Sequence, residues 1–350
     1  MTFSMRILRI LFGSVALSSL VLLLCPFAGV AEPTPVLLVY GFQPIPGFRA
    51  TQLWETMAET LSGNDIVTAQ AVSVAPGHSL FHLPAVGSDH RDVFISDYAL
   101  AYEPTMRDLL FYADRLSDEI TWITEQMSVK KIDVVGHSLG GLIARAYIEI
   151  DDFTDVIGAP GIPDYGIEYG GEIRTLITIA TPHHGMYLAG FGQWLNTLAR
   201  QLAPGSEFLS LLNRDVIIGD RVASLHPDVR YVSMAGQTCF GCGLRRDETA
   251  CLRECVHAGI AWHGSDLVVL MASAYLPEGE NIACIGMDHV DMRVHPAVCS
   301  MVADLLAERG VPPVLYGDPT LQFDEGVHNT GINSSARTGS TARLSDTVLR

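Results

Sequence analysis

The feature that most constrains this chain is a short apolar strand that runs directly into a glycine-rich turn and then into a helix. The strand is Ile132 to Val135, the turn is Gly136 to Gly141 (GHSLGG), and Leu142 to Ile150 continues as a helix. A G-x-S-x-G turn between a strand and a helix predicts a strained backbone that lifts the serine hydroxyl above the sheet. Its glycines leave no Cβ to collide with neighbouring chain. The context predicts that Ser138 is a nucleophile, against the alternative of a glycine-rich turn with an idle serine.

Strands alternate with helices along most of the chain, which has 350 residues and is 48% apolar. Further strands are predicted at Val36 to Tyr40, Ile66 to Val74, Ile173 to Ala180, Tyr231 to Ala235 and Leu267 to Met271. Amphipathic helices are predicted over Thr105 to Met127 and Val298 to Glu308. Alternation of this kind predicts an α/β fold with a mostly parallel sheet and helices on both faces.

The charge balance excludes one class of partner. There are 39 Asp and Glu against 22 Lys and Arg, which gives a net charge of −17, and Lys130 and Lys131 are the only lysines. Since no basic stripe is available for phosphates, we expect no nucleic-acid binding. We also expect no electrostatic attraction to anionic membranes.

The first 31 residues have the pattern of an export signal. Arg6 and Arg9 precede the apolar run Ile10 to Leu24, and the small residues Gly29 to Ala31 fit a cleavage site near Ala31. We therefore expect a secreted protein, periplasmic or extracellular, whose mature chain begins near Glu32. The alternatives are an uncleaved anchor, because the apolar run is long, and a lipoprotein, which Leu24 before Cys25 disfavours.

Six cysteines follow the predicted signal: Cys239, Cys242, Cys251, Cys255, Cys284 and Cys299. An even number in an oxidising compartment favours disulfides, although their pairing cannot be deduced. The spacing within residues 239–255 is also roughly that of a zinc site. Export favours disulfides over zinc.

The remaining chain divides into a predicted catalytic domain over residues 32–316 and a tail over residues 317–350. The tail lacks periodicity and is predicted to be disordered. Within the domain, residues 186–230 form an insertion whose apolar residues recur at helical spacing: Leu188, Phe191, Leu195, Leu198 and Leu202, with Trp194 beside them. This insertion is either a mobile lid or a permanently packed cap.

A serine nucleophile needs a histidine base, which in turn needs a carboxylate to orient it. After this kind of turn the chain order is serine, acid, histidine. The histidines late in the chain are His263, His289, His295 and His328. We predict that His289 is the base because it lies just before the last helix, whereas His295 precedes Pro296 at a helix start and His328 lies in the tail.

Asp266 is the predicted acid. It lies 23 residues before His289 and opens onto the apolar residues Leu267 to Val269. The alternative is a turn aspartate that caps a strand end. Asp247 and Glu248 fall within the cysteine cluster and are interpreted as surface charges.

Four segments resemble secreted bacterial lipases and esterases of the α/β-hydrolase fold, and also inositol-deacylase-like members: Val36 to Phe42 (VLLVYGF), Gly136 to Gly141 (GHSLGG), Thr181 to Gly185 (TPHHG) and Pro204 to Leu209 (PGSEFL). The resemblance runs in order over about residues 35–312 and supports Asp266 and His289 in their roles. The chain departs from the family at Tyr40, where histidine is usual, and at Leu267, where glycine is usual.

Two backbone N–H groups must hold the oxyanion of the tetrahedral intermediate. They are expected from Leu139, which follows the nucleophile, and from Phe42 in the loop after the first strand. His137, His183 and His184 are interpreted as structural. No nucleotide fingerprint is present and the chemistry needs no cofactor. The resemblance leaves a structural calcium ion open, with Asp291 as one ligand.

Together these residues predict a secreted serine hydrolase of carboxylic esters, a lipase or esterase whose substrate is a lipid or other ester and which contacts lipid interfaces transiently. The alternatives within enzymes are an acyltransferase or a deacylase of a larger amphiphile or polyester. A non-catalytic binding protein of the same fold is disfavoured, because nucleophile, acid and base are all present in the required order.

Overall fold

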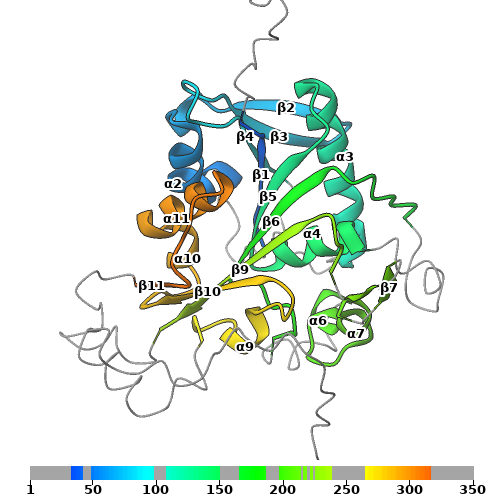
Figure 1. Ribbon diagram of the computed structural model, residues 1–350. Coiled ribbons are helices and arrows are strands. Elements are labelled where there is room, and N and C mark those ends of the chain that lie inside the picture. The colour runs from blue at the N-terminus through cyan, green and yellow to red at the C-terminus, as the bar shows by residue number, and fades with distance from the viewer. Residues whose placement is uncertain are drawn as a thin grey trace, which may run out of the picture.

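The computed structural model describes residues 33–41, 49–97, 108–149, 165–186, 197–213, 216–218, 221–223, 225–238 and 265–316. A nine-stranded sheet in the order β11-β10-β9-β6-β5-β1-β4-β3-β2 runs through this part of the chain (Figure 1). Its strands are β1 (Val36–Val39), β2 (Gln70–Ala75), β3 (His78–Leu83), β4 (Val93–Ser96), β5 (Ile132–His137), β6 (Ile173–Ile179), β9 (Arg230–Gln237), β10 (Glu280–Ile285) and β11 (Val314–Tyr316). Antiparallel pairing is confined to β2 with β3 and β3 with β4, so the sheet is mostly parallel, as predicted.

Helices cover both faces of the sheet, which confirms the predicted fold class (Figure 1). One face carries α3 (Leu109–Met127) and α4 (Leu139–Glu149), and the other carries α2 (Ala50–Ser62), α10 (Asp291–Val294) and α11 (Pro296–Leu306). Successive side chains of β1 point to opposite faces. Accordingly Leu37 and Val39 belong to the core beneath α3 and α4, while Val36 and Leu38 belong to the core beneath α2 and α11.

Local chemistry sets the ends of α3. The Asp108 carboxylate accepts a hydrogen bond from the backbone N–H of Phe111 at 3.0 Å, which caps the first turn. Ser128 adopts a left-handed conformation with φ 53° and ends the helix. The predicted helix over Thr105 to Met127 is therefore confirmed from Leu109 onward, and residues 105–107 lie outside the described residues.

Two predicted strands differ from the structure. The first third of Ile66 to Val74 is a short 3-10 helix, η1 (Ile66–Thr68), because Asp65 accepts a hydrogen bond from Val67 N–H. The prediction of a strand over Leu267 to Met271 is wrong. Asp266 instead holds the following residues in a turn, Leu267 has φ 78°, and α9 (Met271–Ala274) begins where the strand was expected to end.

The described part of the insertion is packed on the body of the domain. It contains α6 (Thr197–Gln201), α7 (Glu207–Leu212) and a hairpin of β7 (Val216–Ile218) and β8 (Arg221–Ala223). Five of its side chains are buried in the same core cluster as α3 and α4: Leu198, Leu202, Phe208, Leu209 and Leu212. In this structure α6 and α7 thus form a packed cap. Leu188, Phe191, Trp194 and Leu195 lie outside the described residues.

A buried arginine ties α4 to this cap. Arg145 donates two hydrogen bonds to the Glu149 carboxylate, at 3.0 and 2.8 Å, and a third to the backbone carbonyl of Leu212 at 2.8 Å. It also donates to the side-chain oxygen of Asn213 at 3.0 Å. Its side chain is fully buried, so each of these bonds replaces one to water.

Replacing Arg145 with methionine is expected to lower the free energy of unfolding by about 3–5 kcal/mol, because the buried Glu149 carboxylate would lose both hydrogen bonds from the guanidinium. Urea unfolding followed by circular dichroism measures this difference. The matched control is Arg309→Met, which breaks an exposed pair with Asp304 and is expected to cost at most about 1 kcal/mol. Equal losses for the two variants would contradict the assignment of Arg145 as the anchor of the cap.

The structure corrects part of the disulfide prediction. Cys284 on β10 and Cys299 on α11 are free thiols, both buried among apolar side chains. Burial raises the pKa of each thiol to about 12, which keeps it protonated and unreactive. Cys239, Cys242, Cys251 and Cys255 lie outside the described residues, as do the predicted signal over residues 1–31 and the tail over residues 317–350. Among the described helices, none combines the length and apolar character that crossing a bilayer requires.

Candidate active site

Ser138 lies in the turn between β5 and α4, at the carboxyl edge of the parallel strands. It has φ 54°, a left-handed conformation that is strained for a residue with a Cβ. Its backbone N–H donates to the carbonyl of Ile179 on the neighbouring strand at 2.8 Å. The residue is 8% exposed, so Ser138 is largely buried together with the rest of the turn. The strain predicted from the G-x-S-x-G pattern is thus present at the serine itself.

The glycines of the turn are required by close approach of backbone. A Cβ on Gly140 would lie 2.2 Å from the carbonyl oxygen of Val39, and one on Gly136 would lie 2.6 Å from Cα of Gly141. Both contacts are with backbone that cannot move aside. The turn therefore packs against the end of β1 in a way that a larger residue would prevent.

Asp266 and His289 meet in one hydrogen-bonded pair, although 23 residues separate them. The distance between His289 Nδ1 and Asp266 Oδ2 is 2.7 Å, and the backbone N–H of His289 donates to the carbonyl of Asp266 at 2.9 Å. The other carboxylate oxygen accepts from the N–H groups of Val268 at 2.9 Å and Val269 at 2.6 Å. Asp266 is 1% exposed, whereas the His289 side chain is 15% exposed. The carboxylate is thus fixed from two sides, and the ring that it holds is partly exposed.

His137 connects this pair to the serine turn. Its Nε2–H donates to the backbone carbonyl of His289 at 2.9 Å, and the two rings lie with their centroids 4.7 Å apart. On its other side it contacts Trp54 of α2 edge to face. Burial, followed by the neighbouring His289 and Arg293, holds the pKa of His137 well below its usual value. A neutral His137, the residue before Ser138, therefore holds the backbone of His289.

Of the two backbone N–H groups expected to hold the oxyanion, only that of Leu139 lies within the described residues. A Cβ on Gly41 would lie 2.6 Å from the backbone nitrogen of Leu139, so the chain leaving β1 passes directly over the first residue of α4. Phe42, the next residue, lies outside the described residues. Gly41, the residue before Phe42, thus lies against the backbone N–H of Leu139. The predicted pairing of the Leu139 and Phe42 donors requires such an approach.

The remaining predicted residues have structural contacts. His183 is buried between Thr178 and Arg145, and burial lowers its pKa well below the usual value. His184 contacts the backbone carbonyl of Tyr275 at 3.2 Å, which ties the loop after β6 to the end of α9. His295 accepts a hydrogen bond from the N–H of Ala297 and caps α11, which is the helix-start position read from the sequence.

Asp291, the suggested calcium ligand, accepts a hydrogen bond from the backbone N–H of Asp288 at 3.3 Å. The side chain of Asp288 in turn accepts from the N–H groups of Val290 and Asp291, both at 2.8 Å. Within the described ranges no three His, Cys, Asp or Glu side chains gather as a metal site would require. The Asp288 carboxylate thus holds the N–H groups at the start of α10, and the Asp291 carboxylate closes the turn before it.

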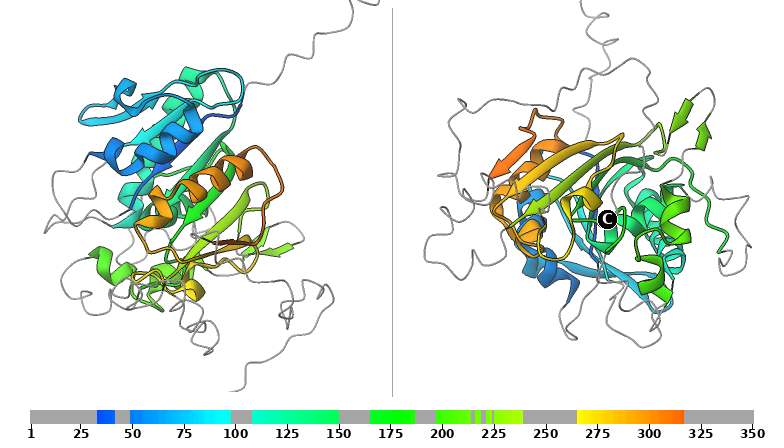
Figure 2. Two further views of the ribbon diagram at one scale, coloured as in Figure 1. Left: turned by 90° about the vertical axis from the view of Figure 1, so that its left-hand side faces the viewer. Right: turned by 90° about the horizontal axis from the view of Figure 1, so that it is seen from below.

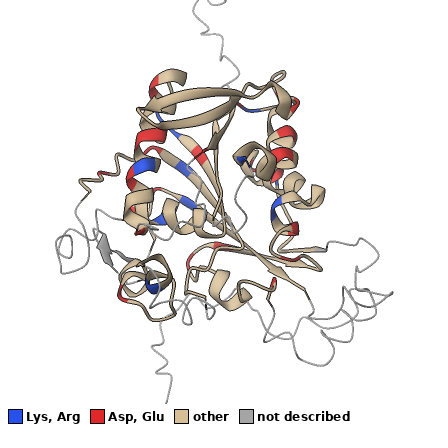
Figure 3. Cartoon of the chain, turned by 180° about the vertical axis from the view of Figure 1, so that it is seen from behind, with Lys and Arg blue, Asp and Glu red and all other residues tan. Residues whose placement is uncertain are grey.

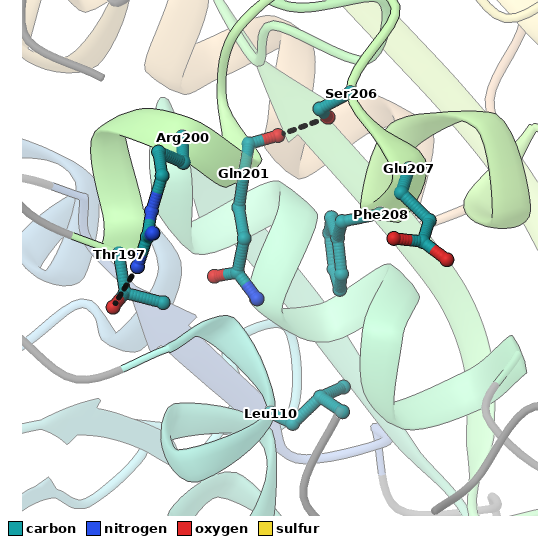
Figure 4. Close-up of a pocket in the computed structure, with 7 residues that line it drawn as sticks. All are labelled: Leu110, Thr197, Arg200, Gln201, Ser206, Glu207 and Phe208. Atoms are coloured by element: carbon teal, nitrogen blue, oxygen red, sulfur yellow. Dashed lines mark hydrogen bonds between the residues drawn. The ribbon is translucent and has the colours of Figure 1, made fainter. Parts of the chain in front are cut away.

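A cavity of about 230 Å³ lies between the start of α3 and the cap (Figure 4). Leu110 and Phe208 give it an apolar side, while Arg200 and Glu207 bring opposite charges. The backbone N–H of Leu109 donates to the side-chain oxygen of Gln201 at 2.8 Å, which joins α3 to α6 at this point. Seen from below the sheet, α6, α7 and α9 all lie toward the viewer, at the end where the serine turn is found (Figure 2, right).

Comparison of the sequence with known proteins finds two partial matches. Residues 80–238 match the family model described as "Putative serine esterase (DUF676)", which includes Ser138 but ends before Asp266. A stretch of 103 residues is 28% identical to the protein named "Putative GPI inositol-deacylase C" from Yarrowia lipolytica. That match covers 28% of this chain and 11% of the relative, so the chain spans only a small part of the relative's length.

A solved structure gives the same fold. The lipase BlEst2 of Bacillus licheniformis in its mature form is similar with a TM-score of 0.50 and 17% identity, over 79% of this chain and 93% of the lipase. At this identity the likeness concerns the fold alone. The propeptide form of the same lipase matches with the same TM-score over 50% of its own chain. The predicted resemblance is confirmed: the chain has the α/β-hydrolase fold and is similar to serine esterases over residues 80–238.

Proposed function

We propose that this protein is a secreted serine hydrolase that cleaves carboxylic esters of lipids, with Ser138 as nucleophile, His289 as base and Asp266 as the acid that orients the base. The observation that carries the proposal is the Asp266–His289 hydrogen bond of 2.7 Å, held beside a serine in a strained turn. A buried carboxylate, an imidazole hydrogen-bonded to it and a serine in the turn between a strand and a helix are what acyl transfer through an activated hydroxyl requires.

The pair defines the proton path. With Asp266 accepting from Nδ1–H, the lone pair of His289 lies on Nε2 and can take the proton of Ser138 as the hydroxyl attacks the ester carbonyl. The resulting imidazolium is stabilised by the carboxylate and returns its proton to the leaving alcohol. Water then repeats the sequence on the acyl-enzyme and releases the acid.

The negative charge on the carbonyl oxygen is held by backbone donors. We assign this role to the N–H groups of Leu139 and Phe42, the first because it begins α4 and the second because Gly41 already contacts Leu139. A helix begins at the same point, and its N-terminus favours negative charge. This arrangement needs no cofactor, and export through residues 1–31 remains part of the proposal.

A deacylase or acyltransferase acting on a larger amphiphile is the second candidate. It is favoured by the match to the Yarrowia lipolytica protein, whose name states inositol deacylation. The same triad would serve, with a different alcohol leaving or entering.

The test is hydrolysis of p-nitrophenyl esters of increasing acyl length by the full chain expressed with export. The proposal expects saturable turnover, with a peak at long chains for a lipase and at short chains for an esterase. Folded protein that hydrolyses none of these esters would contradict simple ester hydrolysis. Release of acyl groups from a glycolipid by the same preparation would then favour the second candidate.

A further inference from the structure

An arginine on α10 lacks a counter-charge among the described residues. Arg293 is partly buried, and its Nε is fully buried without a hydrogen-bond acceptor in the described part of the chain. Burial lowers the pKa of its guanidinium, and no described carboxylate raises it. A cation that is taken out of water without a partner lowers the stability of the folded protein. The position of Arg293 therefore needs a reason other than stability.

Four other arginines that are partly or fully buried are paired with carboxylates. Arg91 and Arg174 contact Asp133, Arg145 contacts Glu149, and Arg230 contacts Glu280. The carboxylates raise the pKa of Arg174 and of Arg230. Acidic side chains are abundant in this chain, which has 39 of them against 22 Lys and Arg, and Figure 3 shows them along the outer helices. A shortage of carboxylates thus does not explain the unpaired Arg293.

Arg293 lies close to the proposed active site. The helix α10 begins two residues after His289, and it packs against α2. Trp54 of α2 contacts His137 edge to face. The charge of Arg293 is near enough to His137 to contribute to the low pKa of that ring. Because His137 directly precedes Ser138, the guanidinium lies within electrostatic reach of the serine turn.

A guanidinium group is suited to an anion with two or more oxygens. Its N–H groups form a planar fork that donates parallel hydrogen bonds to a carboxylate or a phosphate. In Arg293 the N–H of Nε is an unused donor of this fork. The two nearest carboxylates in sequence, Asp288 and Asp291, accept hydrogen bonds from backbone N–H groups instead. An anion from outside the chain would satisfy the donor and neutralise the buried charge.

We propose that Arg293 is a binding residue that selects esters carrying a phosphate or carboxylate group, which it holds while Ser138 attacks the ester carbonyl. This inference rests on the proposed ester hydrolysis and names the chemical class of its substrate. A local positive charge attracts an anion to this site although the net charge of the chain is −17. One anionic group in each substrate molecule is recognised, rather than a charged membrane surface.

Two pairs of soluble esters test the preference. Mono-p-nitrophenyl glutarate is compared with p-nitrophenyl pentanoate, and dihexanoylphosphatidic acid with dihexanoylglycerol. In at least one pair, Arg293→Gln is expected to lower the ratio of kcat/KM on the anionic ester to kcat/KM on the neutral ester at least about tenfold, mainly through KM, because a hydrogen bond between charged groups is lost. The pair that responds distinguishes carboxylate from phosphate. Unchanged ratios in both pairs would overturn the proposal.

The matched control removes the same charge elsewhere. Arg309 is exposed and pairs with Asp304 near the end of α11, so Arg309→Gln is expected to leave both ratios unchanged. Equal falls in the ratios for Arg293→Gln and Arg309→Gln would mean that net charge alone sets the preference, which would overturn the proposal. Arg293→Lys keeps the charge without the planar fork and is expected to recover only part of the preference.

Stability separates binding from a structural role. Arg293→Met removes a buried charge without a partner, so its Tm in the absence of substrate is expected to match or exceed that of the parent. A structural arginine would give the opposite result. A lower Tm together with equal losses of kcat/KM on anionic and neutral esters would make Arg293 a structural residue and would overturn the proposal.

Binding without turnover separates this inference from the proposed function. Calorimetric titration of Ser138→Ala protein with each of the two anionic esters measures Kd. Adding Arg293→Gln is expected to raise Kd at least about tenfold for one of them, whereas adding Arg309→Gln is expected to leave it unchanged. This difference in a protein whose parent hydrolyses no ester would support the anion site and refute the proposed function. Equal Kd values for both esters in all three proteins, with hydrolysis intact in the parent, would refute the anion site alone.

Discussion

Replacing Ser138 with alanine is expected to lower kcat for ester hydrolysis by roughly 10⁶-fold, since the variant has no hydroxyl to form the acyl-enzyme. His289 and Asp266 would remain paired, but they act only through the nucleophile, so their presence recovers little. The backbone donors and the binding surface survive and account for what remains. Steady-state hydrolysis of a soluble p-nitrophenyl ester measures the loss, and trapping of acyl-enzyme at low pH shows whether the covalent step has disappeared.

A second serine provides the matched control. Ser62 is fully buried near the end of α2, and its hydroxyl donates to the carbonyl of Ala58 at 2.7 Å, far from the serine turn. Ser62→Ala is expected to keep kcat within about twofold of the parent while losing about 1 kcal/mol of stability with that hydrogen bond. If Ser138→Ala retained more than a hundredth of the parent kcat in folded protein, another residue would have to be the nucleophile.

The serine turn could be predicted because every element of its signal is local. Three apolar residues among the four before it and an apolar helix after it establish the strand, the turn and the helix in one stretch of sequence. The structure adds the reason for the glycines, since Gly140 approaches the carbonyl of Val39 on a strand about 100 residues earlier in the chain. The sequence does not reveal this contact, although it does show the glycine that the contact requires.

The helix α2 has a sequence pattern from which it could also have been predicted. The helix α2 places Leu53, Trp54, Met57 and Leu61 on one buried face at three- and four-residue spacing, a pattern that predicts an amphipathic helix. It was missed because polar residues surround it and no motif marks it. Trp54 on this helix contacts His137, so the omission also concealed part of the support for the active site.

The remaining failures are those of long-range contacts. Leu267 to Met271 is apolar enough for a strand, but the carboxylate of Asp266 captures the N–H groups of Val268 and Val269 and closes a turn. The contact from His137 to the carbonyl of His289 spans 152 residues and has no local pattern. Sequence reasoning could therefore name Asp266 and His289 as candidates without showing what holds them together.

Asp266→Asn is expected to lower kcat by roughly 10⁴-fold while leaving the fold intact. Both oxygens of this carboxylate are acceptors, one from His289 Nδ1–H and the other from two backbone N–H groups. An asparagine side chain has only one acceptor oxygen, so it can accept either from the ring or from the two backbone N–H groups, but not from both. Two hydrogen bonds from backbone N–H groups are worth more than one from the ring. The asparagine oxygen is therefore expected to accept from Val268 and Val269, and its NH₂ group is expected to face Nδ1 of His289.

An amide N–H at that position makes Nδ1 of His289 an acceptor and moves the ring proton to Nε2. The base then has no lone pair toward Ser138, which is why the expected loss is in kcat rather than in KM. The matched control is Asp288→Asn, whose carboxylate accepts hydrogen bonds from the N–H groups of Val290 and Asp291 at the start of α10. It is expected to change kcat less than about threefold, since only a helix cap is weakened. Comparable losses in kcat for the two variants, with unchanged Tm, would show that the carboxylate at Asp266 does not set the tautomer of His289.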